Sequence, residues 1–155
     1  MNSDGAAHPR ELAHAAFRGA VGAMAMTGMR MCTVDLGIVD ETPPQAIFKQ
    51  KAKGLLALVP RKRRRAAVEL AHWSYGAAGG FAFGLLPAGV RRQPWAGPIY
   101  GLLTWVGFEA GLAPVLGLAQ ARQLRLVERA ALAGDHLLYG LVLSEGRRQP
   151  QENST

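Results

Sequence analysis

The stretch RAAVELAHWSYG, from Arg65 to Gly76, recurs as RAALAGDHLLYG from Arg129 to Gly140. Arginine, the alanine pair, histidine and the tyrosine–glycine pair fall in register in the two copies. In each copy the histidine follows the arginine by seven residues, which is about two turns of an α-helix. The repeat therefore predicts one helix that occurs twice, with His72 and His136 at the same level of the fold.

Apolar residues gather in separate segments of this 155-residue chain, and a basic loop and polar ends lie between and around them. A long cationic side chain followed by an apolar helix is typical of a helix that enters a bilayer and leaves the cation at the interface. The 19 glycines suit closely packed membrane helices. We therefore expect an all-α, polytopic membrane protein, with residues 1–155 as a single domain. Its four transmembrane helices are expected at about 13–34, 66–86, 98–119 and 126–143, with polar tails at 1–11 and 145–155.

Small side chains recur every fourth residue in the first two segments. In the second segment this face includes His72, so the imidazole is expected to point toward a neighbouring helix. Small residues at this spacing let two helix backbones approach closely. The sequence predicts glycine-zipper packing at Gly19, Gly76, Gly80, Gly84, Gly107 and Gly111.

Residues 44–59 form a segment that is too short and too basic to cross a bilayer. Its alternation of apolar residues and lysines predicts an amphipathic helix in the plane of the lipid headgroups. A polybasic loop follows, and cations that flank a membrane span commonly contact anionic lipid, so we expect no nucleic-acid partner. The expected headgroup contacts are Lys49, Lys51, Lys53, Arg61, Lys62, Arg63, Arg64 and Arg65.

The loops at 40–65 and 119–130 carry most of the Lys and Arg residues. The positive-inside rule then places these loops in the cytoplasm and the chain in the inner (plasma) membrane as a multi-pass protein. The small-residue faces can meet within one chain or between two copies, which leaves a homo-oligomer open.

Ionisable groups inside the predicted spans fall at similar depths. His72 and His136 lie about 10 Å beyond their arginines, and Glu109 is the one ionisable residue of the third segment. Such groups are costly in hydrocarbon, so they turn inward and pair with one another. The sequence predicts a buried polar network of His72, Glu109, Asp135, His136, Tyr75 and Tyr139.

Several roles are open for this network. The network can serve as a structural set of hydrogen bonds or as a proton or ion route. It can also be a b-type haem site with His72 and His136 as ligands, or part of an enzyme that acts on lipid. No nucleophile elbow, phosphate loop or H-E-x-x-H motif occurs, and Cys32 is the single cysteine. We therefore expect no enzyme, no catalytic residue, no metal and no cofactor, with haem b as the alternative.

The leading hypothesis is a non-enzymatic membrane protein whose buried His/Glu network is linked to proton or ion handling. The alternative function is a haem-binding electron carrier. The remaining structural competitor is a helical interaction protein that does not enter a membrane, in which the glycine faces are ordinary core contacts.

A resemblance to a known family rests on a series of short motifs. Pro43-Pro44 is followed by His-x-x-Tyr-Gly in a glycine-rich segment, then by an apolar segment with one acid and Pro114, and last by His136-x-x-Tyr139-Gly140 and Arg147-Arg148. This order resembles the YagU-like family of small bacterial inner-membrane proteins, over about residues 66 to 148. The resemblance implies a polytopic membrane protein of undefined activity. Phe108 stands where such proteins often carry a second acid, which speaks against a paired-carboxylate mechanism.

Overall fold

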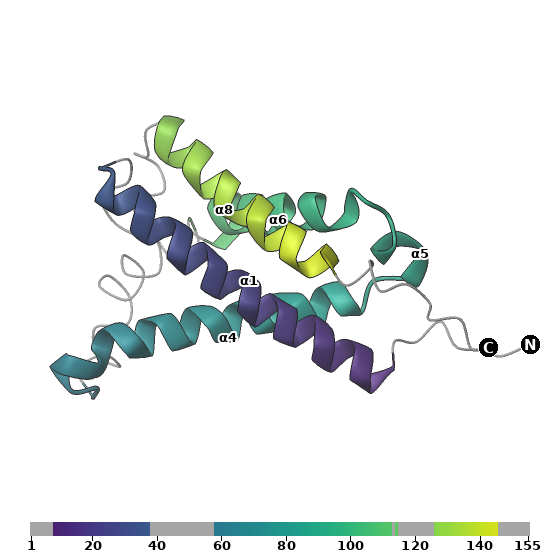
Figure 1. The fold of residues 1–155 in the computed structure, drawn as a ribbon, viewed down its shortest axis with the longest axis horizontal. Coiled ribbons are helices and arrows are strands. Elements are labelled where there is room, and N and C mark those ends of the chain that lie inside the picture. The colour runs from purple at the N-terminus through teal and green to yellow at the C-terminus, as the bar shows by residue number, and fades with distance from the viewer. Residues whose placement is uncertain (1–7, 38–57, 113, 115–125, 146–155) are drawn as a thin grey trace, which may run out of the picture.

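A computed structural model describes residues 8–37, 58–112, 114 and 126–145. Over these ranges the chain forms helices and no strand (Figure 1). The long helices are α1 (Pro9–Asp35), α4 (Arg64–Gly84), α6 (Ala96–Val106) and α8 (Leu126–Ser144). The shorter segments are η1 (Arg61–Arg63), α5 (Ala88–Arg91) and η2 (Gly107–Leu112), a π-helix that continues α6.

Local sequence signals set both ends of α1. His8 caps its start, because its Nδ1 accepts a hydrogen bond from the backbone N–H of Arg10 at 3.3 Å. Pro9 suits the first helical position, and Glu11 lies near the positive end of the helix dipole. Just beyond the last turn, Gly37 takes a φ of 67°, a left-handed conformation that favours glycine. The 27 residues between these signals form the longest helix of the described structure.

The helices pack as two pairs joined along one side. Helix α1 crosses α4, α6 packs against α8, and α1 also packs against α8 (Figure 1). The core where the two pairs meet contains Met26, Phe83, Ala96, Tyr139 and Leu143. Phe83 also contacts Tyr100 edge to face, with 5.1 Å between the ring centroids. Helix α1 therefore packs against a helix of each pair, and α4 adds contacts to α6 and α8.

Glycines bring α1 and α4 into backbone contact. A Cβ atom on Gly19 would collide with the carbonyl oxygen of Gly76 and would lie 2.8 Å from the Cα of Gly80. A Cβ on Gly80 would in turn collide with the carbonyl oxygen of Ala15. Gly84 continues the contact, since a Cβ there would lie 2.9 Å from the Cβ of Ala15. Only residues without a side chain permit this approach.

The second pair, α6 and α8, meets in the same way. Cβ atoms on Gly97 and Gly140 would each collide with the carbonyl oxygen of the other residue. A Cβ on Gly101 would collide with the carbonyl oxygen of His136. Gly76 and Gly140 end the two copies of the sequence repeat, so the repeat places equivalent glycines at the crossing point of each pair.

The prediction of a polytopic bundle with four transmembrane helices is wrong. Among the described residues, no helix is both long enough and apolar enough to cross a membrane. The described parts of the predicted segments lie largely on helices, but α1 contains Arg18 and Arg30, and α4 contains Glu69 and His72. The most apolar segment, α6, ends after 11 residues where the π-helix begins. The prediction of membrane-spanning helices is therefore withdrawn for the described residues.

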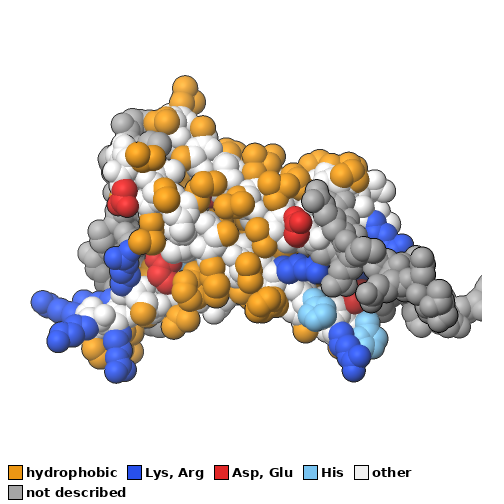
Figure 2. All heavy atoms as spheres, in the orientation of Figure 1, with side chains coloured by type: hydrophobic (Ala, Val, Ile, Leu, Met, Phe, Trp, Pro, Cys, Tyr) orange, Lys and Arg blue, Asp and Glu red, His pale blue; other side chains and the backbone are white. Residues whose placement is uncertain are grey.

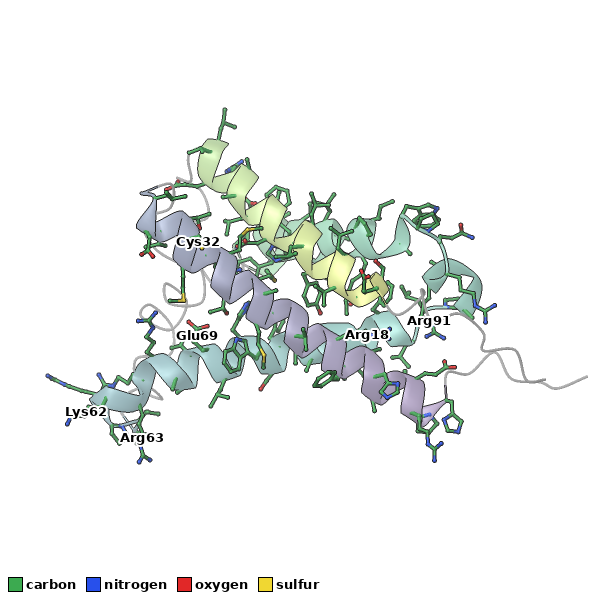
Figure 3. All side chains as sticks on the ribbon, viewed as in Figure 1. Arg18, Cys32, Lys62, Arg63, Glu69 and Arg91 are labelled. Atoms are coloured by element: carbon green, nitrogen blue, oxygen red, sulfur yellow. The ribbon has the colours of Figure 1, made fainter. Side chains whose placement is uncertain are left out.

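The predicted in-plane helix over 44–59 lies outside the described residues except for positions 58 and 59, as do Lys49, Lys51 and Lys53. The cations that precede α4 are described, and Lys62 and Arg63 point away from the body of the molecule (Figure 3). Arg64 is half-buried and donates from Nε to the carbonyl oxygen of Val59 at 3.1 Å. Contact of these cations with lipid headgroups stays a prediction.

Candidate functional site

A buried ion pair connects α1 to α8. Arg30 donates from Nε to Oδ2 of Asp135 at 2.8 Å, and the two side chains are 7% and 4% exposed. Two opposite charges this far from water must be paired, because removing one partner leaves the other desolvated and uncompensated. We call Arg30, His72, Asp135 and His136 the polar cluster; they come from α1, α4 and α8.

The two repeat histidines lie near this ion pair, His72 on α4 and His136 on α8, since the charge of Arg30 acts on both. His136 donates from Nδ1 to the carbonyl oxygen of Leu132, one turn earlier, at 2.8 Å. A carbonyl oxygen only accepts, so the proton of neutral His136 sits on Nδ1 and its Nε2 is an acceptor. The Nε2 of His72 is buried and has no hydrogen-bond partner among the residues that the structure describes.

Burial keeps both imidazoles neutral at physiological pH. Desolvation, the positive charge of Arg30 and the proximity of His136 together lower the pKa of His72 to about 4. The pKa of His136 is also lowered to about 4, chiefly by desolvation; its backbone hydrogen bond to Leu132 opposes the shift and the charge of Arg30 adds to it. Both imidazoles therefore respond to the charge that lies in the ion pair.

The acid of the cluster is shifted in the opposite sense. Burial raises the pKa of Asp135, while the charge and the hydrogen bond of Arg30 lower it. The guanidinium of Arg30 stays charged at any pH of interest, so it favours the ionised form of this carboxylate. Asp135 is thus tied to α1 through its bond to Arg30.

Tyr139 carries the contact between the two helix pairs. Its hydroxyl donates to the carbonyl oxygen of Gly76 at 2.7 Å, and the side chain is 5% exposed. Its ring also fills the space beside Gly22, where a Cβ would lie 2.8 Å from Cδ2 of the ring. Burial raises the pKa of Tyr139, so the hydroxyl remains a donor. Tyr100 makes a parallel bond, from its hydroxyl to the carbonyl oxygen of Gly79 at 2.8 Å.

A second polar contact joins α1 to α4, and the sequence analysis did not include its acid. Thr27 lies 3.1 Å from Oε2 of Glu69, and Trp73 donates from Nε1 to the Thr27 hydroxyl at 3.2 Å. Glu69 extends from α4 toward α1 (Figure 3). The sequence holds one sign of this contact. Glu69 precedes His72 by three residues in an apolar segment, so both side chains lie on one face of the helix.

The structure brings some predicted network residues together and separates others. His72, Asp135 and His136 join Arg30 in the polar cluster, and Tyr139 bonds to the backbone of Gly76. Glu109 instead pairs with Arg129, the arginine of the second repeat, at 3.4 Å. Tyr75 is 61% exposed. The predicted packing glycines also fall into two groups. Cβ atoms on Gly107 and Gly111 would meet nothing within 4 Å, so these two glycines are not in a close helix contact of the described structure.

The haem alternative stays a prediction. Each repeat histidine is four residues before a glycine that is in backbone contact with the neighbouring helix, Gly76 or Gly140. No group of three or more His, Cys, Asp or Glu side chains in the described part of the chain is arranged to hold a metal ion.

Comparisons with known proteins add no relative. No family model matches the chain, and neither a curated protein nor a solved structure matches it. The resemblance to the YagU-like family therefore stays a prediction, and the polar cluster is interpreted from its own chemistry.

Proposed function

We propose that the protein is a non-enzymatic helical protein whose polar cluster responds to protons. At neutral pH the cluster holds the two helix pairs together, and its protonation loosens their junction. The observation that carries this proposal is the position of two half-buried imidazoles near the buried Arg30–Asp135 ion pair, with the Nε2 of His72 buried and His136 bonded to the carbonyl oxygen of Leu132.

Charge balance supports the proposal. At neutral pH the cluster contains one cation, Arg30, and one anion, Asp135, in direct contact. Protonation of His72 and His136 would add two further positive charges in the same buried space. Like charges repel one another more strongly in the low-dielectric interior of a protein than in water. The protonated cluster is stable only if α1, α4 and α8 separate enough to admit water.

The direction of the pH dependence follows from the two histidines. An imidazole in the unfolded chain titrates near pH 6.5, whereas the pKa of each buried imidazole is about 4. Between these values the unfolded chain binds more protons than the folded chain, so stability falls as the pH falls. The stabilisation is complete above about pH 6.5 and is lost toward about pH 4. Each histidine accounts for about 3 kcal/mol of this change at most.

The test is a series of chemical denaturation curves between about pH 4.5 and about pH 8, followed by circular dichroism. The wild-type protein should lose several kcal/mol of unfolding free energy across this range, most of it below about pH 6.5. The variants His72→Gln and His136→Gln keep a neutral polar side chain that takes up no proton. Each should flatten the profile by about half, and the double variant should remove most of it.

His8 provides the matched control, because it is exposed at the start of α1 and lies outside the cluster. The variant His8→Asn keeps a side chain that can cap the helix and should reproduce the wild-type profile. A wild-type profile without a decline below about pH 6.5 would contradict the proposal, and so would a decline that survives in the double variant.

A further inference from the structure

A stripe of exposed side chains runs along the whole of α1, on the side away from the bundle. Its members alternate in steps of four and three residues, and they include Arg10, Phe17, Val21, Met24, Gly28 and Asp35. Phe17 is 69% exposed, Val21 38% and Met24 43%. Figure 2 shows hydrophobic side chains across the front of the molecule, where Figure 1 places α1.

The stripe lies opposite the face that α1 buries. The buried residues Gly19, Ala23 and Met26 form the inner face, and at about 100° per residue the stripe points in the reverse direction. Steps of four and three residues are the heptad spacing of a helix that packs against another long helix. Over 27 residues, α1 offers this pattern for roughly 40 Å. Within the described structure no other helix covers it.

The stripe is complementary to itself when reversed end to end. About a centre between Val21 and Met24, these two residues exchange places in a two-fold pair of helices. Phe17 then meets Gly28, where a Cβ would find nothing within 4 Å, so the largest side chain faces the smallest. At the ends Arg10 meets Asp35, which are opposite in charge and both exposed. His14 and Met31 form the remaining layer.

We infer that α1 pairs with α1 of a second copy of this chain in an antiparallel, two-fold dimer. The charges select this arrangement over a parallel one. In a parallel pair Arg10 would face Arg10, Asp35 would face Asp35 and the Phe17 rings would crowd each other. Antiparallel pairing replaces these contacts with two Arg10–Asp35 pairs and two Phe17–Gly28 layers.

The first test is the concentration dependence of molecular mass, measured by sedimentation equilibrium in about 0.15 M salt, which screens the net charge of +7. The wild-type protein should reach the mass of two chains. Arg10→Asp should raise the dissociation constant about tenfold, because two attractive pairs become repulsive. The double variant Arg10→Asp with Asp35→Arg should restore wild-type affinity. Lys62→Asp makes the same charge change outside the stripe and should leave it unchanged.

The hydrophobic centre should have a larger effect. Phe17→Ala removes an exposed ring from both copies and should weaken the dimer about a hundredfold. Since Phe17 is not part of the core, the circular dichroism of this variant should equal that of the wild type, which separates loss of pairing from loss of fold.

A crosslinking experiment tests the direction of pairing. Cys32 is exposed, so it is first replaced by serine, and Val21→Cys and Met24→Cys are made as two proteins of different length. Oxidation of the mixture should join one Val21→Cys chain to one Met24→Cys chain. Disulfides formed chiefly between identical chains indicate a parallel pair and overturn the inference. A wild-type protein that remains a monomer up to about 1 mM also overturns it.

Discussion

The two helix pairs use the same backbone contact and different polar contacts. In α1/α4 and in α6/α8, the glycine that ends the repeat, Gly76 or Gly140, lies against the backbone of the partner helix. The tyrosines that precede these glycines differ in burial. Tyr139 is buried and bonded to Gly76, whereas its counterpart Tyr75 is 61% exposed.

The acids of the two copies also differ. The first copy has Glu69 where the second has Ala133, and the second has Asp135 where the first has Ala71. Glu69 bonds to Thr27 and Asp135 to Arg30, so both copies reach α1 through different side chains. The repeated part of the sequence therefore specifies how each pair forms. The parts that differ specify how α1 holds the pairs together.

The largest difference between the two copies should come from their acids. Asp135→Ala gives the second copy the residue that the first has at this position, and it leaves Arg30 buried without its partner. We expect the unfolding free energy at neutral pH to fall by about 4 kcal/mol. Glu69→Ala removes a half-buried bond to a hydroxyl and should cost only about 1 kcal/mol. Urea denaturation measures both; equal losses would show that the acids are interchangeable.

The glycines test the feature that the pairs share. Gly140→Ala forces a methyl group into the carbonyl group of Gly97 and should cost about 3 kcal/mol. Gly76→Ala meets the Cβ of Ala23 at 2.5 Å and should cost about 2 kcal/mol. Gly134→Ala is the control within α8, because a Cβ there meets nothing within 4 Å and alanine should stabilise the helix by up to about 1 kcal/mol. Thermal melts of the three variants check this order, and a stabilising Gly140→Ala would contradict close contact in the second pair.

The smallest expected effect separates the two tyrosines. Tyr139→Phe removes a buried donor from the carbonyl oxygen of Gly76 and should cost about 1 kcal/mol. Tyr75→Phe alters an exposed hydroxyl and should change the unfolding free energy by less than about 0.5 kcal/mol. Denaturation curves of the two variants, compared at the same pH, measure the difference. An equal loss in both would place Tyr75 in a contact as well.

Sequence periodicity anticipated several parts of this structure and misread others. The repeat predicted two related helices, and α4 and α8 contain them. The spacing of Gly76, Gly80 and Gly84 indicated one face that meets another helix, and α1 occupies that face. Periodicity says which residues share a face, however, and glycine-rich apolar faces suit any close helix pair. Membrane spans share this pattern, but no helix among the described residues is both long and apolar enough to cross a membrane.

The candidate site was anticipated in part for the same reason. His72 and His136 could be placed at one level from the repeat alone, because both follow an arginine by seven residues. The partner of Asp135 could not, since Arg30 is 105 residues away in the sequence and is brought near by the packing of α1 on α8. Glu109 was assigned to the imidazoles on depth alone, although Arg129 offered a charge of opposite sign nearer in the fold.

The most direct test of the proton-responsive cluster is an NMR titration of the imidazole protons in the folded protein, with His72→Gln and His136→Gln used for assignment. Neutral His72 and His136 at about pH 5.5, with midpoints near 4, are the predicted result. If either imidazole is protonated in the folded protein by about pH 6, the burial and the charge balance that define the cluster are contradicted.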